Sequence, residues 1–312
     1  MVRPILIDCD PGIDDCIALM LALASPEALD VRAIHTVAGN VPVDVCTRNA
    51  LGVLALAGRS DIPVHAGCPR PMVEAPVFAD HVHGPCGLGA AQLPPAQSHA
   101  QDAHAVSHLI ETLRAAEPAS LTLVITGPMT NLAVALIQAP DIAAAIGELV
   151  IMGGARAAGG NITASAEFNI YADPHAARIV LACGRPITLI GLDATLQFRC
   201  TPQRMSRLEH SGHRAAELAH TMIRHVNAVY GALYGSEGAA LHDPCTIGYL
   251  LAPELFATCP AAVEVETRAG LTRGHTAIDV YLGDGAQPNI RWATGVDAPA
   301  LFDLMLDRIT RL

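Results

Sequence analysis

The stretch of residues 5–23, ILIDCDPGIDDCIALMLAL, limits the possible folds more than any other part of the chain. Residues 4–7 are apolar and partly β-branched, which predicts a buried strand, while the apolar run over residues 16–23 predicts a helix. Asp10-Pro11-Gly12 is then a tight turn between them. A strand, a turn and a helix in this order are typical of the start of an α/β protein.

Four aspartates lie within this stretch: Asp8, Asp10, Asp14 and Asp15. Ligands of an open parallel sheet bind outside the carboxyl ends of its strands, which is where the turn falls. One alternative is that Asp14 and Asp15 only cap the first helical turn. However, carboxylates this close together repel one another unless a positive charge lies between them, and a hard cation with oxygen ligands is the simplest candidate.

The pattern of alternating strands and helices continues after this opening. Further strands are predicted over residues 31–37, 62–65, 121–125, 148–152 and 186–191, and helices over residues 43–56, 103–116, 132–138, 173–183 and 203–234, the last with a break at 211–212. The C-terminal part is predicted to be a β extension over residues 262–267, 276–282 and 289–293, closed by a helix over 298–311. This order predicts an α/β fold with an open, mostly parallel central sheet flanked by helices. Without a linker or an internal repeat, residues 1–312 are expected to form a single domain.

The composition excludes several classes of function. A formal net charge of −11 without a basic cluster argues against nucleic-acid binding. All 19 basic residues are arginine, which excludes P-loop NTPases, Schiff-base aldolases and pyridoxal enzymes, because each needs a lysine. No apolar run reaches membrane-spanning length and no signal peptide is recognised, so we expect a soluble cytoplasmic protein. The nine cysteines contain no CxxC pair, and we expect reduced thiols.

Polar residues also follow other predicted strands. Asn40 follows the second strand and Thr126 follows the strand over 121–125, and either could simply shape a turn or cap a helix. In His242-Asp243-Pro244, Asp243 can serve as a helix N-cap and Pro244 as the first helical residue. Because these positions lie at one edge of a parallel sheet, we expect them to converge with the aspartates.

Two irregular segments are rich in side chains that can bind a ligand. Residues 66–101 contain His81 and His83, which could be read as a zinc pair but lack a third ligand nearby, so a solvated loop or a substrate contact is favoured. Residues 159–174 hold Asn161, Glu167 and Asn169, and carboxylates and amides of this kind suit the recognition of hydroxyl groups.

The predicted site is dominated by oxygen ligands, which favours Ca²⁺ or Mg²⁺ over Zn²⁺. Such an ion acidifies a bound water only partly, so a carboxylate would be needed as general base, and a histidine could serve as acid on the leaving side. Hydrolysis is therefore the predicted class of reaction.

The segment from Asp8 to Asp15, DCDPGIDD, resembles the amino-terminal signature of the nucleoside hydrolases, the inosine-uridine-preferring nucleoside N-ribohydrolase family. Further matches follow in order, namely TVAGN at 36–40, HG at 83–84, TGPMTN at 126–131, MGG at 152–154, the segment 160–169, DP at 173–174 and HDP at 242–244. Small departures are Ala164, where many relatives carry Pro, and Met129, where Leu is common. The ordered set spans roughly residues 7–250 and makes the resemblance specific.

The resemblance implies hydrolysis of the N-glycosidic bond of ribonucleosides and one tightly bound Ca²⁺. The implied ion ligands are Asp10, Asp15, the Thr126 carbonyl and Asp243. Asp10 would activate a metal-bound water, His242 would assist departure of the base, and Asp8 would be structural. The implied substrate contacts are Asp14, Asn40, His83, Met152, Asn161, Glu167 and Asn169. The family also implies a homodimer or homotetramer.

Three questions stay open at this point. Tyr230 and Tyr234 lie four residues apart on one helix face and are candidates for base contacts, although packing explains them equally well. The preference for purine or pyrimidine nucleosides is also open. Rival functions are a non-catalytic nucleoside or ribose binding protein and, less favoured, a haloacid-dehalogenase-like phosphatase, which shares the D-x-D motif but needs a threonine-bearing turn and a basic residue, usually lysine.

Overall fold

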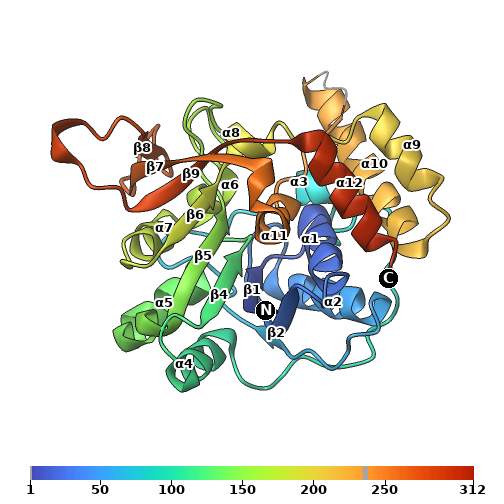
Figure 1. The fold of residues 1–312 in the computed structure, drawn as a ribbon, viewed down its shortest axis with the longest axis horizontal. Helices are drawn as coiled ribbons and strands as arrows, with labels where there is room; N and C mark the ends of the chain where they lie inside the picture. The colour runs from blue at the N-terminus through green and yellow to red at the C-terminus, as the bar shows by residue number, and fades with distance from the viewer. Residues whose placement is uncertain (1, 235–237) are drawn as a thin grey trace.

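A sheet of nine strands forms the centre of the molecule (Figure 1). The computed structural model describes residues 2–234 and 238–312, with the backbone alone at residues 233, 234 and 284. The strand order is β3-β2-β1-β4-β5-β6-β9-β7-β8. The strands are β1 (Arg3–Cys9), β2 (Leu29–Thr36), β3 (Val64–Ala66), β4 (Leu121–Ile125), β5 (Ile146–Met152), β6 (Ile187–Ile190), β7 (Phe256–Val265), β8 (Thr276–Asp279) and β9 (Ile290–Val296). Only the pairings of β7 with β9 and β8 are antiparallel, so the predicted α/β fold with a mostly parallel sheet is confirmed.

Helices cover both faces of this sheet. They are α1 (Ile13–Leu23), α2 (Val43–Leu56), α3 (Asp80–His83), α4 (Ala105–Ala115), α5 (Thr130–Gln138), α6 (Phe168–Ala172), α7 (Pro174–Leu181), α8 (Leu192–Thr195), α9 (Pro202–Glu209), α10 (Arg214–Tyr234), α11 (Pro244–Leu251) and α12 (Ala298–Ile309), with 3₁₀ turns at Pro140–Ala145, Pro253–Leu255 and Gly283–Gly285. One core lies between the sheet and α1, α2, α10, α11 and α12, and a second lies between the sheet and α4, α5 and α7. Strand β1 alternates between them, with Ile5 and Ile7 in the first core and Leu6 in the second.

Several predicted boundaries were wrong. Helix α1 begins at Ile13, ahead of the apolar run from residue 16, so Asp14 and Asp15 lie in its first turn as expected, and the Asp15 carboxylate accepts the Gly12 N–H there. Strand β3 begins at Val64, two residues after the predicted start at residue 62. The segments 66–101 and 159–174, which were expected to be irregular, contain the short helices α3 and α6. Strand β7 begins at residue 256 although it contains Pro260, since β8 pairs only with Ala262–Val265 and leaves one side of Pro260 without a strand neighbour.

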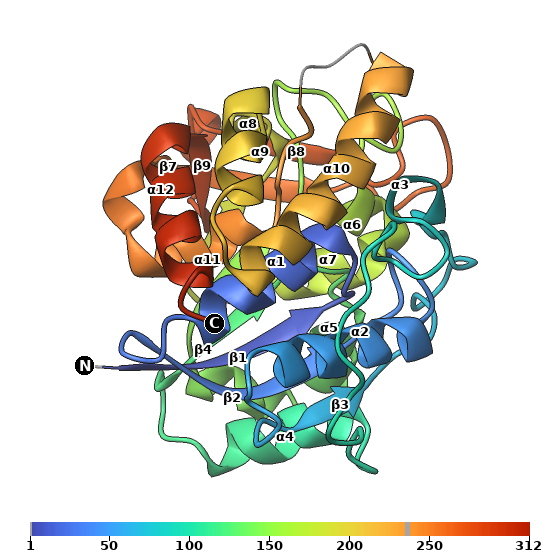
Figure 2. The ribbon, with the colours of Figure 1, turned by 90° about the vertical axis from the view of Figure 1, so that its right-hand side faces the viewer.

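The carboxyl ends of the parallel strands point toward the side of the molecule where α3 and α6 lie (Figure 2). Helix α10, which is separated from α1 by almost 200 residues in sequence, lies across α1 at this side and contacts α3. Among the described residues, no helix is long and apolar enough to cross a membrane. The fold therefore concentrates segments from the whole chain around one edge of the sheet.

Candidate active site

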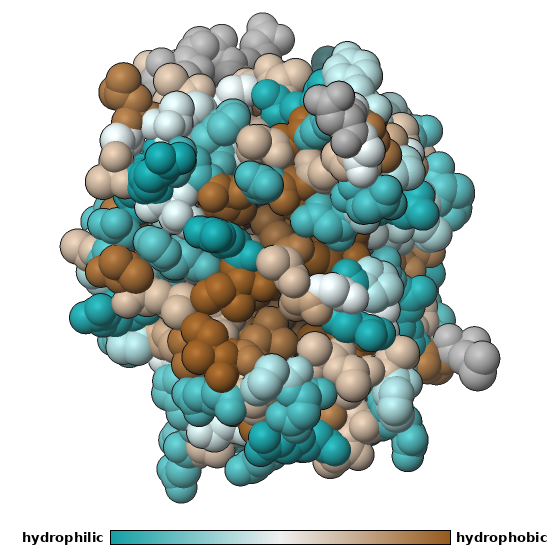
Figure 3. Space-filling view, turned by 90° about the vertical axis from the view of Figure 1, so that its left-hand side faces the viewer, coloured by the Kyte–Doolittle hydropathy of each residue, from teal (hydrophilic) through white to brown (hydrophobic). Residues whose placement is uncertain are grey.

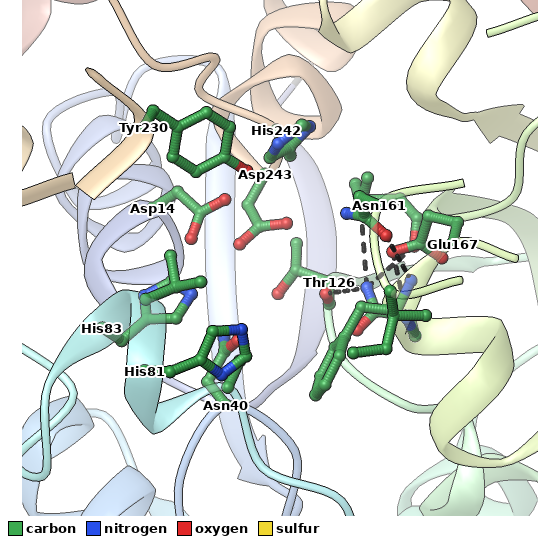
Figure 4. A pocket seen from close by; sticks show the side chains of 16 residues that line it. Asp14, Asn40, His81, His83, Thr126, Asn161, Glu167, Tyr230, His242 and Asp243 are labelled. Atoms are coloured by element: carbon green, nitrogen blue, oxygen red, sulfur yellow. Dashed lines mark hydrogen bonds between the residues drawn. The ribbon is translucent and has the colours of Figure 1, made fainter. Parts of the chain in front are cut away.

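A pocket opens at this edge of the sheet (Figure 4). Of the predicted site residues, those that line it are Asp14, Asn40, His83, Thr126, Met152, Asn161, Glu167, Asn169, Tyr230, His242 and Asp243. Asp10 and Asp15 are fully buried beneath the lining. The side chain of Tyr234 lies outside the described residues. Phe168, between Glu167 and Asn169, also lines the pocket, as do Ala79, Val82 and Ile162, which are ordinary apolar residues that carry no chemical signal in the sequence.

Asp10 lies on the turn that follows β1, with backbone packed tightly around it. Its Oδ2 accepts the Asn40 backbone N–H at 2.6 Å, whereas its buried Oδ1 has no hydrogen-bond partner among the described residues. A Cβ atom at Gly39 would lie 2.1 Å from Oδ2, and one at Gly127 would lie 2.7 Å from Oδ1. Glycine at both turns is therefore what lets the backbone approach this carboxylate so closely.

Asp15 both caps α1 and joins the site. Its Oδ2 accepts from the Gly12 N–H at 3.1 Å and from Asn40 Nδ2 at 2.9 Å, while its Oδ1 accepts from Thr126 Oγ1 at 2.7 Å. The capping interpretation is thus correct for Asp15 but incomplete. The bonds to Asn40 and Thr126 tie the ends of three parallel strands to one carboxylate.

Asp243 occupies the N-cap position of α11 without capping it, so the predicted capping role of its side chain was wrong. The backbone carbonyls of His242 and Asp243 already accept the N–H groups of Cys245 and Thr246. The carboxylate is therefore free to face the pocket beside Asp14 (Figure 4). Ligand oxygens of Asp14, Asp15 and Asp243 all lie within 4.8 Å of one another, so these three side chains could hold a metal ion.

The electrostatics of this acidic floor fit a hard cation. Burial, reinforced by the Asp15 charge, raises the pKa of Asp10 well above its usual range. Burial and then the charge of Asp14 raise the pKa of Asp15, and they raise the pKa of Asp243 well above its usual range. A cation between these carboxylates would reverse the effect, and the unpartnered Asp10 Oδ1 is an oxygen of the required kind. Asp10 is nevertheless not one of the three carboxylates that converge within 4.8 Å.

Thr126 contributes to the floor through both of its oxygen atoms. Its hydroxyl donates to Asp15, and its backbone carbonyl accepts from Asn169 Nδ2 at 2.6 Å. A carbonyl oxygen has a second lone pair, so this bond leaves room for the predicted metal contact.

The opposite wall presents Asn161, Glu167 and Asn169. The Glu167 carboxylate caps α6 and accepts the N–H groups of Asn169 at 3.0 Å, Ile170 at 3.3 Å and Gly154 at 3.0 Å. Burial, opposed by these backbone hydrogen bonds, raises the pKa of Glu167 to about 7. The carbonyl oxygen of Asn161 accepts the Phe168 N–H, which directs its amide nitrogen to other partners. This wall is rigidly held by backbone bonds and offers both donors and acceptors.

Two histidines approach the pocket from other elements. His242 Nδ1 lies 2.7 Å from Thr195 Oγ1, while its buried Nε2 has no partner among the described residues. His83 Nδ1 accepts the Ile13 N–H at 3.0 Å, so the proton of the neutral ring lies on Nε2. Burial lowers the pKa of both rings. His81 also lines the pocket, but the metal-capable group found among the described residues contains no histidine, which gives the zinc alternative no support.

Asp8 is held away from the pocket. Its Oδ1 accepts from Asn131 Nδ2 at 2.9 Å, and burial raises its pKa to about 7. The amide of Asn131 also bonds to the backbone at Thr36 and Cys68, so this pair connects β1 and β2 to α5.

The fold and the acidic pocket at the carboxyl edge of its sheet can be compared with those of known protein families. The family described as inosine-uridine preferring nucleoside hydrolase matches residues 5–303. The chain belongs to this family, which confirms the resemblance read from its motifs and its assignment as an enzyme that hydrolyses nucleosides.

The chain is also similar over nearly its whole length to individual proteins and solved structures. The chain is 43% identical over 311 residues to a pyrimidine-specific ribonucleoside hydrolase of Escherichia coli O9:H4, with 99% of each chain covered. It is 42% identical over 308 residues to an uncharacterised protein of Schizosaccharomyces pombe. Among solved structures, a plant nucleoside hydrolase has a TM-score of 0.93 at 33% identity with 99% of both chains covered. The purine-preferring ribonucleoside hydrolase of Gardnerella vaginalis has a TM-score of 0.91 at 33% identity, covering 99% and 98%.

Proposed function

We propose that this enzyme hydrolyses the N-glycosidic bond of ribonucleosides with an activated water, releasing ribose and the free base. The observation that carries this proposal is the pairing, within one pocket, of an acidic floor with a histidine whose Nε2 has no partner among the described residues. The acidic floor supplies a general base beside a cation, and the histidine supplies a proton donor on the side of the leaving base. One chain thus provides both functions that glycosidic hydrolysis requires.

The proposed ion is a single Ca²⁺ held by Asp10, Asp15, Asp243 and the Thr126 carbonyl. An all-oxygen ligand set supports this choice over zinc. The ion, when bound, supplies positive charge against the carboxylates and lowers the pKa of a bound water. Asp10 then removes the proton of the attacking water, and its Oδ1 is supported in this role because no described group competes for it.

We assign the ribose to the polar side chains around the floor. Asp14, Asn161, Glu167 and Asn169 would bind its hydroxyl groups, with Asn40, Met152 and His83 close by. Cleavage of a glycosidic bond passes through a state in which the sugar carries positive charge. Fixed carboxylates and amide dipoles stabilise that state more than the neutral substrate, which is how this wall would lower the barrier.

His242 would protonate the leaving base. The water oxygen bonds to the anomeric carbon, the water proton passes to Asp10, and the nitrogen of the departing base takes a proton from His242 Nε2. Tyr230 lines the same part of the pocket and is the described candidate for contact with the base. The greater identity to a pyrimidine-specific enzyme than to a purine-preferring one supports pyrimidine ribonucleosides as the better substrates.

The assignment is tested with a panel of purine and pyrimidine nucleosides and detection of the reducing sugar. We expect ribose release from at least one nucleoside, with uridine or cytidine turned over faster than inosine. Calorimetric binding of nucleosides without any ribose release would instead support a non-catalytic binding protein. Phosphate release from phosphomonoesters, without free base from nucleosides, would support the phosphatase alternative.

Three further expectations belong to this proposal, namely a single domain, a cytoplasmic location and a homodimer or homotetramer. The single domain is supported by the continuity of one sheet through all nine strands. An oligomer is supported by exposed hydrophobic side chains such as Ile137 (57% exposed) and Tyr281 (85% exposed). Figure 3 shows hydrophobic residues gathered in a hollow on the side of the molecule where α5 and the β7–β8 hairpin lie. Light scattering of the purified protein measures its oligomeric state.

A further inference from the structure

We propose that Thr195 is a positioning residue for His242, holding the ring so that Nε2 faces the leaving base. This inference rests on the proposed function and names a residue that the sequence motifs do not include. Thr195 is fully buried at the end of α8, and its Oγ1 lies 2.7 Å from His242 Nδ1. No other hydrogen bond to the ring of His242 is formed by the described residues, because its Nε2 is unpartnered. Thr195 is thus the one described side chain that forms a hydrogen bond with this ring.

The hydroxyl group suits this position chemically. A histidine ring can flip by rotation about its Cβ–Cγ bond, which would turn Nε2 away from the leaving base. A hydrogen bond to Nδ1 opposes that flip. The threonine hydroxyl both donates and accepts, so it can bond to Nδ1 whether or not Nδ1 carries a proton. Loss of the Nε2 proton does not itself change the protonation of Nδ1, so the contact persists before and after His242 gives up that proton. A carboxylate would only accept, and would hold a proton on Nδ1.

Thr195 is itself held by the backbone at the start of α8, which bonds to the loop after β5. The N–H of Thr195 bonds to Gly191 O at 3.0 Å, and the N–H of Leu192 bonds to Gly154 O at 2.9 Å. A Cβ atom at Gly191 would lie 2.3 Å from Gly154 O, so the two loops touch directly. Since Gly154 also donates to Glu167, the same backbone contact joins the support of His242 to the wall that we assign to the ribose.

The experiment compares Thr195→Val, which keeps the shape of the side chain and removes the hydroxyl, with Thr195→Ser, which keeps the hydroxyl. We expect Thr195→Val to lower kcat on natural nucleosides by about 10-fold or more, a part of the roughly 10²–10⁴-fold that a positioned acid contributes. Its KM should stay within about 2-fold, and its kcat on a nitrophenyl riboside, which needs little help to leave, should fall far less. Thr195→Ser should recover most of the loss.

Thr188→Val is the matched control. Thr188 is also buried and hydrogen-bonded, on the neighbouring strand β6, but its partners Glu148 and Tyr249 lie outside the pocket lining. We expect its kinetics to match those of the wild type on both substrates. Equal losses on nucleoside and nitrophenyl riboside in Thr195→Val would show a merely structural role for Thr195 and overturn the proposal.

Two further measurements separate this inference from the proposed function. In a double-mutant cycle, Thr195→Val should add almost nothing to His242→Ala, because the two residues act as one unit. Selective ¹⁵N labelling of the histidines, with the His242 signals assigned by their loss in His242→Ala, reports the ring nitrogens without any need for turnover. Unchanged ¹⁵N chemical shifts of His242 in Thr195→Val would contradict the role of Thr195, whether or not the wild type is active. An absence of nucleoside hydrolysis by the wild type would instead contradict the proposed function.

Discussion

Two clusters of like titratable side chains are buried in this molecule, and only one of them adjoins the pocket. The carboxylate cluster consists of Asp10, Asp15 and Asp243. The histidine stack consists of His35 on β2, His65 on β3 and His108 on α4, with ring centroids 3.8 Å apart for His65 and His108 and 5.8 Å apart for His35 and His65. Burial favours neutral side chains in both clusters. It raises the pKa values of the carboxylates and lowers that of His35, and it lowers the pKa of His108 to about 4.

His35 Nδ1 and Asp10 Oδ1 are both buried without a hydrogen-bond partner among the described residues, so the difference between the clusters lies in where the unpartnered atom is placed. A neutral imidazole is both donor and acceptor, so His35 Nε2 and His108 Nδ1 bond to each other at 2.8 Å, and His65 Nδ1 donates to the Ala103 carbonyl at 2.8 Å. In the carboxylate cluster, Asp10 and Asp15 accept from the backbone and side chain of Asn40, and Asp10 Oδ1, which has no hydrogen-bond partner among the described residues, lies beneath the pocket lining. Clustering and a shifted pKa are therefore insufficient signs of function. Acceptors that lack donors and adjoin a cavity are the informative combination.

The largest expected effect is that of Asp10→Asn on turnover. This change keeps the size of the side chain but removes the general base, and we expect kcat to fall by at least about 10²-fold while nucleoside binding survives. The matched change in the other cluster, His35→Gln, should leave kcat within about 2-fold, because the histidine stack lies outside the pocket lining. Steady-state kinetics with calorimetric binding checks both, and unchanged turnover in Asp10→Asn would refute its assignment as base.

A smaller effect is expected from removing and restoring the metal. Chelation should lower both activity and the melting temperature, and Ca²⁺ should restore both, with about 2.7 kcal/mol of stabilisation at 100 times its Kd. Because the folded carboxylates have raised pKa values, their contribution to the stability of the metal-free protein is present at low pH and is lost as pH rises. The stabilisation by Ca²⁺ should therefore increase from pH 5 to pH 8. Calorimetric melting with and without Ca²⁺ measures this, and full activity in metal-free protein would falsify the metal requirement.

The sequence predicted the carboxylate cluster better than the histidine stack for a physical reason. The turn at Asp10, the helix start at Asp15 and the parallel sheet edge are all local or topological features, and together they bring the acidic residues to one place. The capping of α1 by His83, from 70 residues away, has no local signal. Neither has the bond between Thr195 and His242, since the first contact depends on how α3 packs against the start of α1 and the second on how α8 packs beside His242.

The contacts within the histidine stack also have no local signal in the sequence. His35, His65 and His108 lie on two strands and a helix, and nothing in their spacing indicates that they touch. Even the register that places His35 beside His65 becomes visible only when β2 and β3 are paired. Sequence reasoning thus located the groups that a turn or a strand end presents, and missed those that only tertiary packing brings together.

The smallest expected effect concerns the stability of the histidine stack in acid. Because the folded pKa values of His35 and His108 lie below the unfolded value near 6.5, their contribution to stability is present above pH 6.5 and is lost as pH falls toward about 4. His108→Gln keeps a donor and an acceptor but cannot be protonated, so the variant should lose less stability than the wild type between pH 7 and pH 5. His108 is only partly buried, so solvent screening limits the difference to about 1 kcal/mol. Melting curves of the Ca²⁺-saturated proteins, in which the carboxylates are held constant, measure the difference directly, and parallel curves for the two proteins would show that the stack carries no proton-linked stability.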